Sequence, residues 1–384
     1  MVLVGLTALS CLIWTYLLFF NGWFWFANET LDDAGHLEKW PSVVAIIPAR
    51  NEAKTIGDVV EGHLASTYPG QFSINVVDDQ SDDGTGQIAR ALGGKGPRSV
   101  GVVNGVPLPE GWSGKLWAVH NGLEVVHAME EKPDYVLLTD ADIVNSPEVL
   151  QNLVLKAENE NRVLVSVMAH LDARGVWGSL LIPAFIFFFQ KLYPFASTNK
   201  DASSVAGAAG GCMLVHYETL VEIGGVEAVR DTLIDDCSLA YKLKDPKGSK
   251  RSIWLGFDKG VVSLRDNREL STIWKMVART AFTQLHFSNL ALVGTLFGMF
   301  LTYLIAPIAF FTLPLHGSTL AFTLGSWGWF AAMIAYAPTL IRYKKSPLWL
   351  LLLPVSALYY TAMTWSSAFN HWRGKGGAWK GRTY

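Results

Sequence analysis

Long uncharged runs of hydrophobic residues occur near both ends of the sequence. Residues 2–27 contain no charged side chain, and they are long enough to cross a bilayer of about 30 Å, since a helix rises about 1.5 Å per residue. This run lacks the basic start, the short apolar core and the small-residue cleavage site of a signal peptide. It ends in aromatic residues, from Trp23 to Phe26, which are typical of a membrane interface. We therefore predict an uncleaved membrane anchor over 1–27.

Three further apolar stretches lie at about 290–313, 319–341 and 348–369, and each is long enough to span a bilayer. Their prolines are tolerated in membrane helices. We assign 289–370 to transmembrane or re-entrant helices and 371–384 to a basic tail. The number of crossings stays open, because three crossings would carry the basic tail away from the cytosolic side, against the positive-inside rule.

Residues 30–288, between these runs, have the composition of a globular α/β domain. Short β-branched runs alternate there with helical stretches, which is typical of βαβ units in a mostly parallel, Rossmann-like sheet. The four runs are VVAIIPA (43–49), INVVDD (74–79), YVLLTDAD (135–142) and RVLVSVM (162–168). The apolar run 176–195 differs, because Pro183 interrupts it and Gln190 and Lys191 come near its end. We interpret it as an amphipathic segment on the membrane surface, with a buried core helix as the alternative.

Composition narrows the class of protein. Half of the 384 residues are hydrophobic and only 17% are charged, which is below the usual quarter for soluble domains, so part of the apolar surface must face lipid. The formal net charge of −2 gives no basic field of the kind that marks a nucleic-acid-binding protein. The three cysteines, Cys11, Cys212 and Cys237, lack metal-ligand spacing. They indicate neither a zinc site nor a disulfide framework and fit a reducing compartment.

Acidic or turn-rich clusters follow the predicted strands, where the strand ends of an open α/β sheet form a ligand-binding crevice. The first cluster consists of Pro48, Ala49, Arg50, Asn51 and Glu52. A strand-to-helix turn capped by Asn51 would explain this cluster equally well. In the second cluster, Asp78 and Asp79 can accept hydrogen bonds from a base edge and a ribose. The turn after them starts a helix whose N-terminus attracts anions, although a solvated acidic turn is the alternative.

The third cluster places Asp140 and Asp142 at a strand end, where the backbone can turn both carboxylates towards one hard cation. Mg²⁺ and Mn²⁺ prefer oxygen ligands and often bridge carboxylates to substrate phosphates. Any acidic loop can produce an isolated DxD pattern. The position of this one, roughly sixty residues after the first acidic pair and again at a strand end, strengthens the prediction of a metal site.

Two further motifs complete the candidate site. Asp235 and Asp236 open a predicted helix after a glycine-rich patch, where the backbone at Gly210 and Gly211 could lie close to an acceptor. The alternative for the two carboxylates is stabilisation of a helix N-terminus. Lys115 follows glycines at a predicted helix start and could contact a diphosphate, but the Walker spacing is missing and an ordinary exposed lysine is equally consistent.

In this order, over residues 43–280, the motifs resemble the family 2 glycosyltransferases with a GT-A fold. The resemblance implies that segment 48–52 and the Asp78-Asp79 pair hold the nucleotide. It also implies that Asp140 contacts the donor and the metal, that Asp142 binds the divalent metal, Mg²⁺ or Mn²⁺, and that Asp236 is the general base. Asp235 stands where the family usually has glutamate. The segments GAAGGCML, VGLTALSCLIW and WRGKGGAWKGRTY are similar to hopanoid-biosynthesis-associated glycosyltransferases, which are related to ceramide glucosyltransferases.

The sequence departs from the processive polysaccharide synthases at 276–280. Only Arg279 of their QxxRW motif is present, and the glutamine and the tryptophan that would stack against a growing polymer are missing. This argues against a polymerase. Arg279 could still contact the diphosphate of the donor, and a packing or lipid-interface role explains it equally well.

These features together predict an enzyme that transfers a sugar from a nucleotide sugar, with a UDP-sugar as the first expectation, to a membrane lipid alcohol. One base and no nucleophilic carboxylate imply a single displacement with inversion. The resemblance implies a hopanoid-type acceptor and a multi-pass protein of the bacterial inner membrane with its catalytic domain in the cytosol. A polyprenyl-phosphate sugar synthase and a polysaccharide synthase are the alternatives. A non-catalytic membrane protein is disfavoured because every expected acidic position is filled.

Overall fold

The structure is a computed structural model that describes residues 1–31, 35–96, 98–230, 232, 234–244 and 251–374, together with the backbone of 378–379 and 382–383. The chain forms two compact units. The helical unit comprises Met1–Ala27, Asp172–Ala196 and Asp266–Gly377. The α/β unit comprises Asn28–Leu171, Ser197–Arg265 and Ala378–Tyr384.

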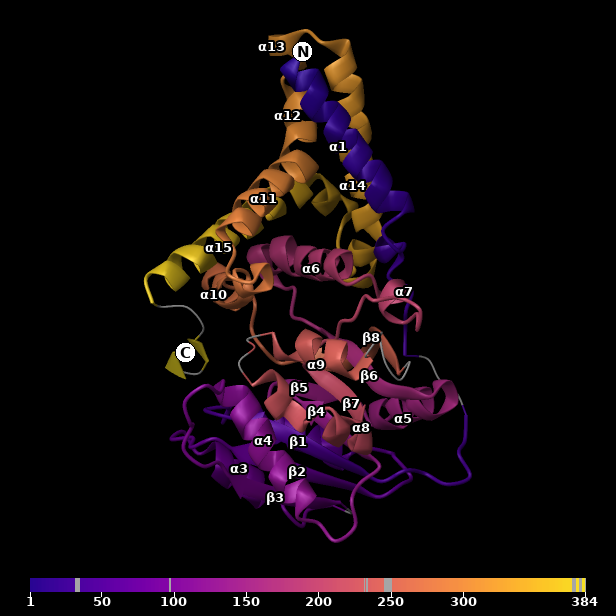
Figure 1. Ribbon diagram of the computed structural model, residues 1–384, viewed down its shortest axis with the longest axis vertical. Helices are drawn as coiled ribbons and strands as arrows, with labels where there is room; N and C mark the ends of the chain where they lie inside the picture. Colours follow the sequence, from indigo (N-terminus) through magenta and orange to yellow (C-terminus); the bar gives the residue numbers. More distant parts are fainter. Residues whose placement is uncertain are drawn as a thin grey trace. The chain divides into compact units, whose positions relative to one another are not determined.

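The α/β unit is built on an eight-stranded mixed sheet with the strand order β3-β2-β1-β4-β7-β6-β8-β5 (Figure 1). Its strands are β1 (Val43–Ala49), β2 (Phe72–Asp78), β3 (Ser99–Asn104), β4 (Tyr135–Thr139), β5 (Ile143–Asn145), β6 (Arg162–His170), β7 (Cys212–His216) and β8 (Ser252–Ser263). Strands β3, β2, β1 and β4 are mutually parallel, as are β6 and β8. Strand β7 is antiparallel to β4 and β6, and β5 is antiparallel to β8. The prediction of a mostly parallel sheet is confirmed.

Helices cover both faces of the sheet. They are α2 (Ile56–Leu64), α3 (Thr85–Ala91), α4 (Gly114–His127), α5 (Val149–Glu160), α8 (Tyr217–Glu222) and α9 (Asp235–Lys244). Alternate residues of β1 point to opposite faces: Ala45 and Ile47 pack in one core with α2, α3 and α5, whereas Val44 and Ile46 pack in another with α4, α8 and α9. A strand buried on both faces is continuously hydrophobic, which is why the run 43–49 is so clear in the sequence.

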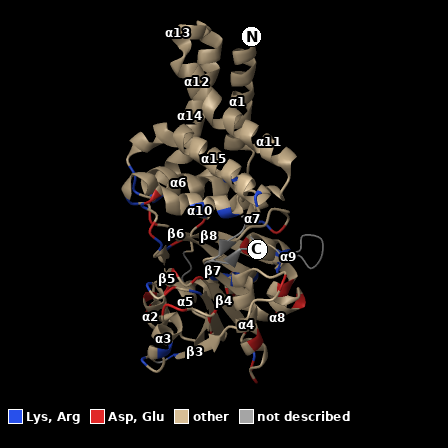
Figure 2. Ribbon diagram, turned by 90° about the vertical axis from the view of Figure 1, so that its left-hand side faces the viewer, with Lys and Arg blue, Asp and Glu red and all other residues tan. Residues whose placement is uncertain are grey.

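The helical unit consists of helices, several of which are long and apolar. They are α1 (Val2–Phe19), α6 (Gly175–Leu192), α10 (Leu270–Thr280), α11 (Asn289–Met299), α12 (Ile305–Phe311), α13 (Leu313–His316), α14 (Thr319–Arg342) and α15 (Leu353–Trp372). Within the described residues, five helical stretches are long and apolar enough to cross a membrane: Val2–Phe19, Gly175–Thr198, Asn289–Phe311, Thr319–Arg342 and Pro347–Trp372. Charged side chains are sparse along α1, α12 and α14 (Figure 2). The expected membrane-type helices at both ends of the sequence are therefore present.

Helix α6 corresponds to the run 176–195. Its residues Leu181, Ile182 and Phe187 are fully buried in the helical unit. Two of its carbonyls accept hydrogen bonds from α15, because the hydroxyls of Ser356 and Tyr360 donate to Leu180 O and Leu181 O at 2.8 and 2.9 Å. This burial agrees with the alternative that residues 176–195 form a buried core helix. The stretch Gly175–Thr198 is also long and apolar enough to span a membrane. Its placement on a membrane surface stays a prediction.

Candidate functional site

A small pocket in the α/β unit lies beyond the carboxyl ends of the central strands. Its polar and glycine lining comes from four motifs that are far apart in the sequence: Lys115, Thr139, Asp140, Gly210, Asp235 and Asp236. Pro48, near the end of β1, lines it as well. Strand-end motifs predicted separately are thus brought to one place, as expected for the crevice of an open α/β sheet.

Lys115 connects two of the acidic motifs. It lies in the first turn of α4, which Ser113 caps by accepting a hydrogen bond from Leu116 N. Its ammonium is 2.7 Å from Asp140 Oδ1 and 3.8 Å from Asp235 Oδ2. Burial lowers the pKa of Lys115, but the two carboxylates raise this pKa by more, so the net shift is upward. The lysine is therefore a charged residue of the pocket, and its contact with a diphosphate stays a prediction.

Asp236 is held by backbone donors at the start of α9. Its Oδ2 accepts a hydrogen bond from Gly210 N and its Oδ1 from Cys237 N, both at 2.8 Å. Burial and the neighbouring Asp235 raise the pKa of Asp236 to about 6, against the opposing effects of Lys115 and the two N–H groups. A side chain at Gly210 would place its Cβ 3.1 Å from Asp236 Oδ2, so glycine allows this close approach. A fixed carboxylate with a pKa near neutrality suits a general base.

The glycine-rich segment also contacts the DxD motif. Gly211 O accepts hydrogen bonds from Thr139 Oγ1 at 2.9 Å and from Asp140 N at 3.3 Å. Gly210 and Gly211 therefore join the end of β4 to the start of α9 through backbone contacts. Their role towards an acceptor stays a prediction, and Leu233, in the loop before α9, lies outside the described residues.

Asp142 is almost buried, with 8% of its surface exposed. Its Oδ2 lies 3.1 Å from Arg265 Nε, and its carbonyl accepts a hydrogen bond from Leu264 N at 2.8 Å. Burial raises the pKa of Asp142; Arg265 lowers it, and the carboxylates of Asp140 and Glu52 raise it further. A nearby cation stabilises the ionised form of such a carboxylate. The oxygen atoms of Asp142 are therefore suitable ligands for a hard metal ion.

The protein ligands for such an ion would be few. Within the described residues, no group of three or more His, Cys, Asp or Glu side chains could hold a metal. Mg²⁺ sites often use one or two carboxylates and complete their coordination with substrate phosphates and water. Asp140 and Asp142 fit that kind of site. Arg265, which the sequence reasoning missed, follows the end of β8 and carries no motif of its own.

The first cluster, residues 48–52, and the second cluster, which begins at Asp78, are joined by hydrogen bonds beside the ends of β1 and β2. Arg50 Nη1 donates to Asp79 O at 2.6 Å and lies 3.8 Å from Asp79 Oδ2. Asp79 is 1% exposed, and its N–H donates to Ala49 O at 2.8 Å. Glu52 N donates to Thr85 Oγ1 at 2.8 Å. The two motifs are therefore neighbours in the structure, and nucleotide binding by them stays a prediction.

Asn51 does not cap the following helix. The N-cap residue of α2 is Thr55, whereas Asn51 has a φ of 51° and its side chain accepts a hydrogen bond from Asp82 N at 3.1 Å. The first cluster is thus a turn that is fastened to the second cluster, and the capping alternative does not describe it.

Replacing Gly86 with alanine should weaken nucleotide binding about tenfold, the effect of losing about one hydrogen bond. A Cβ at this position of α3 would clash with Asp78 Oδ2, so the carboxylate would have to move. Gly57→Ala is the matched control, because its Cβ would only touch Ile88 at an ordinary 3.6 Å. Calorimetric titration with UDP measures the effect, and equal affinities in the two variants would exclude Asp78 from the nucleotide site.

Arg279 is not part of the α/β unit. It lies on α10 in the helical unit, and its proposed contact with a diphosphate stays a prediction. The helix carries Lys275 one turn earlier, and both side chains are exposed.

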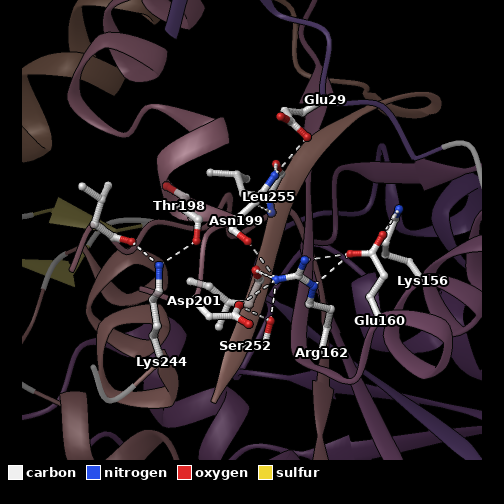
Figure 3. A network of polar contacts seen from close by, with 12 residues as sticks. Glu29, Lys156, Glu160, Arg162, Thr198, Asn199, Asp201, Lys244, Ser252 and Leu255 are labelled. Carbon is white, nitrogen blue, oxygen red and sulfur yellow. Dashed lines mark hydrogen bonds and ion pairs between the residues drawn. The ribbon is translucent and has the colours of Figure 1, made fainter. Parts of the chain in front are cut away.

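A buried polar network supports the segment that leads to the glycine-rich patch (Figure 3). Lys244, the last residue of α9, is 1% exposed and its ammonium donates to Thr198 O and Val205 O, each at 2.7 Å. Burial lowers the pKa of Lys244 to about 8, so the side chain is still charged at neutral pH. Helix α9 therefore contacts segment 198–210 at both ends, through Lys244 and through Asp236.

The same segment is also fixed to β8. The Asn199 side chain accepts a hydrogen bond from Leu255 N at 2.7 Å and donates to Leu255 O at 3.0 Å. Arg162, at the start of β6, donates to Asn199 O and to Ile253 O, both at 3.0 Å. These polar residues were missed by the sequence reasoning, because an isolated lysine, arginine or asparagine gives no sign that it is buried.

The sequence matches a known enzyme family over much of the α/β unit. Residues 44–224 match the family model for glycosyl transferase family 2, so this part of the chain is similar to that family. The mannosyltransferase PcManGT from Pyrobaculum calidifontis, solved in complex with GDP-Man and Mn²⁺, is similar with a TM-score of 0.57 at 19% identity, covering 96% of this chain and 99% of that chain. Such a likeness shows the fold, and the expected GT-A fold is confirmed.

Two curated proteins are also similar to the chain. An N-acetylglucosaminyltransferase of Mesorhizobium japonicum is 32% identical over 126 residues, which are 32% of this chain and 27% of the relative. A 4,4'-diaponeurosporenoate glycosyltransferase of Staphylococcus aureus is 28% identical over 204 residues, which are 52% of this chain and 50% of the relative. The matches thus span about a quarter and a half of the lengths of these relatives.

Proposed function

We propose that this chain, whose residues 44–224 match the family model for glycosyl transferase family 2, transfers a sugar from a nucleotide sugar to a membrane lipid with inversion at the anomeric carbon. The observation that carries the proposal is the Asp236 carboxylate, which two backbone N–H groups fix in the same pocket as Lys115 and Asp140. A general base beside a lysine that can face the leaving group is what sugar transfer from a diphosphate requires.

The chemistry follows from these placements. The acceptor oxygen forms a bond with the anomeric carbon while the bond between that carbon and the diphosphate oxygen breaks. Asp236 takes the proton of the acceptor hydroxyl during the attack. Lys115 lies where it can neutralise charge on the leaving diphosphate. A divalent cation held by Asp142 and Asp140 would supply further charge neutralisation when bound. One base that acts without a covalent intermediate gives inversion.

The strand-end carboxylates and a similar solved structure both indicate which donor and metal to test first. Asp78 is the last residue of β2 and Asp79 follows it, at a place where acceptors of hydrogen bonds from a base and a ribose are expected. A UDP-sugar remains the first donor to test. The similar structure of PcManGT contains GDP-Man and Mn²⁺, so GDP-mannose is the second donor and Mn²⁺ the first metal to test.

The helical unit supports a membrane location and a lipid acceptor. Five described stretches are long and apolar enough to cross a membrane, which supports a multi-pass protein of the bacterial inner membrane with the α/β unit on the cytosolic side, where nucleotide sugars are available. A lipid alcohol is the acceptor that suits this location. The similarity of the glycine-rich and terminal segments to hopanoid-associated enzymes makes a hopanoid-type alcohol the specific candidate.

Incubation of the purified full-length protein with radiolabelled UDP-sugars or GDP-mannose, Mn²⁺ and a bacterial lipid extract tests this proposal. We expect label to enter the organic phase in a product that is stable to mild acid, and a chelator to prevent its formation. Release of the sugar by mild acid would identify a lipid phosphate as the acceptor. A labelled polymer would identify a polysaccharide synthase, and the absence of any product would contradict sugar transfer.

A further inference from the structure

The carboxylates proposed to hold a metal are already paired with cationic side chains. Arg265 Nε lies 3.1 Å from Asp142 Oδ2, and Lys115 Nζ lies 2.7 Å from Asp140 Oδ1. Each cation comes from a different strand end or helix start than the carboxylate that it contacts. One oxygen of each carboxylate is thus in contact with a cation of the protein itself.

The local charge explains why these pairs would resist a metal ion alone. Asp140 and Asp142 carry two negative charges and are met by the two positive charges of Lys115 and Arg265. Lys115 would keep Asp235, 3.8 Å away, as a partner. A divalent ion on Asp142, however, must displace Arg265 from its ion pair, and losing that pair is costly beside a nearly buried carboxylate. A diphosphate brings its own negative charge and offers the displaced cations new partners.

Arg265 is suited to such an exchange. Its backbone is fixed next to Asp142, because the preceding residue, Leu264, donates its N–H to Asp142 O at 2.8 Å. Its side chain, in contrast, is 41% exposed and can change its rotamer without unpacking the core. The guanidinium can therefore leave one carboxylate and bind phosphate oxygens, which it contacts with the same planar donors.

We propose that Arg265 occupies the metal-binding carboxylate of Asp142 until a divalent metal and a nucleotide diphosphate bind together, and that it thereby couples their affinities. This inference rests on the proposed function, since it needs a metal and a diphosphate at this site. Coupling between two ligands is reciprocal. UDP therefore tightens Mn²⁺ binding by the same factor as Mn²⁺ tightens UDP binding.

Titration of Mn²⁺ followed by the electron paramagnetic resonance of free Mn²⁺, with and without UDP, tests the exchange without any need for turnover. In the parent protein we expect Mn²⁺ alone to bind weakly and UDP to tighten it about tenfold or more. In Arg265→Gln, Mn²⁺ alone should bind about tenfold more tightly, and the coupling factor should shrink. Arg265→Lys, which keeps a cation, should lie between the two.

Arg268→Gln is the matched control, because it removes an equal charge three residues away whose partner is Asp266 at 2.5 Å. Its Mn²⁺ affinity should equal that of the parent. If Mn²⁺ binds with UDP but Arg265→Gln and Arg265→Lys leave the affinity for Mn²⁺ alone unchanged or weaker, the exchange is refuted while the metal site stands. If Mn²⁺ binds to no variant even with UDP, the metal part of the proposed function fails, and the exchange fails with it.

Discussion

Replacing Asp236 with asparagine should lower kcat by about 10²- to 10⁴-fold, the usual contribution of a general base, and should leave the affinity for the nucleotide nearly unchanged. The amide cannot take a proton from the acceptor, but its oxygen can still accept a hydrogen bond from the N–H of Gly210 or Cys237. Steady-state kinetics with the active donor and lipid measure kcat, and titration with UDP measures binding. A variant that keeps most of its turnover would show that another group is the base.

The pH dependence gives an independent test of the same residue. Burial and Asp235 raise the pKa of Asp236 to about 6, and the base acts as a carboxylate. We therefore expect kcat/KM to fall about tenfold per pH unit below pH 6. Asp235→Asn removes a neighbouring negative charge, so it should lower the pKa of Asp236 and move this limb to lower pH. If kcat/KM of Asp236→Asn still fell below pH 6, the group that titrates there would be a different one.

Thermal stability separates loss of the base from loss of the fold. Because the pKa of Asp236 is higher in the folded protein than the ordinary 3.8, the native state binds more protons than the unfolded state between that value and about 6, and stability falls as the pH rises through this window. At pH 7 the asparagine variant avoids the burial of a charge. Its amide oxygen satisfies only one of the two N–H groups, so the two effects oppose each other and its Tm should stay close to that of the parent. A much lower Tm would mean that the carboxylate is needed for folding.

The parts of the fold that the sequence predicted are those encoded by local pattern. Strand β1 is buried on both faces and has the same bounds as the run 43–49, and β4 ends just before the DxD motif. Strand β7 was not foreseen, because its antiparallel insertion between β4 and β6 depends on contacts between distant segments. The prediction of βαβ units from the four runs therefore did not include β7, which lies between β4 and β6.

In the candidate site, too, some residues could be predicted from the sequence and others could be found only from the fold. The carboxylates stand directly after strands, so an acidic pair such as Asp140 and Asp142 could be found from its position alone. The cationic side chains that pair with these carboxylates, or that support the segments around them, could not be found from the sequence. Arg265 reaches Asp142 from the end of β8, and Lys244 reaches Thr198 from the end of α9. Only the fold reveals such partners, since exposed and buried lysines or arginines are alike in a sequence.

Replacing Lys244 with methionine should lower the stability of the α/β unit by about 2 to 3 kcal/mol, or roughly 5 to 10 °C in Tm. Methionine fills the space of the buried stem but leaves Thr198 O and Val205 O without the donor that each now has at 2.7 Å. Lys242→Met is the matched control, because it removes the same charge from an exposed position on the same helix and should shift the Tm little. Differential scanning fluorimetry of both variants measures the difference.

The kcat of Lys244→Met shows whether Lys244 supports the candidate site or only stabilises the fold. Segment 198–210 is held by Lys244 at one end and by Asp236, through Gly210 N, at the other. Below its Tm, Lys244→Met should therefore show a lower kcat and faster proteolytic cleavage within 198–205 than Lys242→Met, with UDP affinity retained because Asp78 and Asp79 lie on a different strand end. Equal kcat values for the two variants, together with a lower Tm for Lys244→Met, would confine this lysine to a purely structural role.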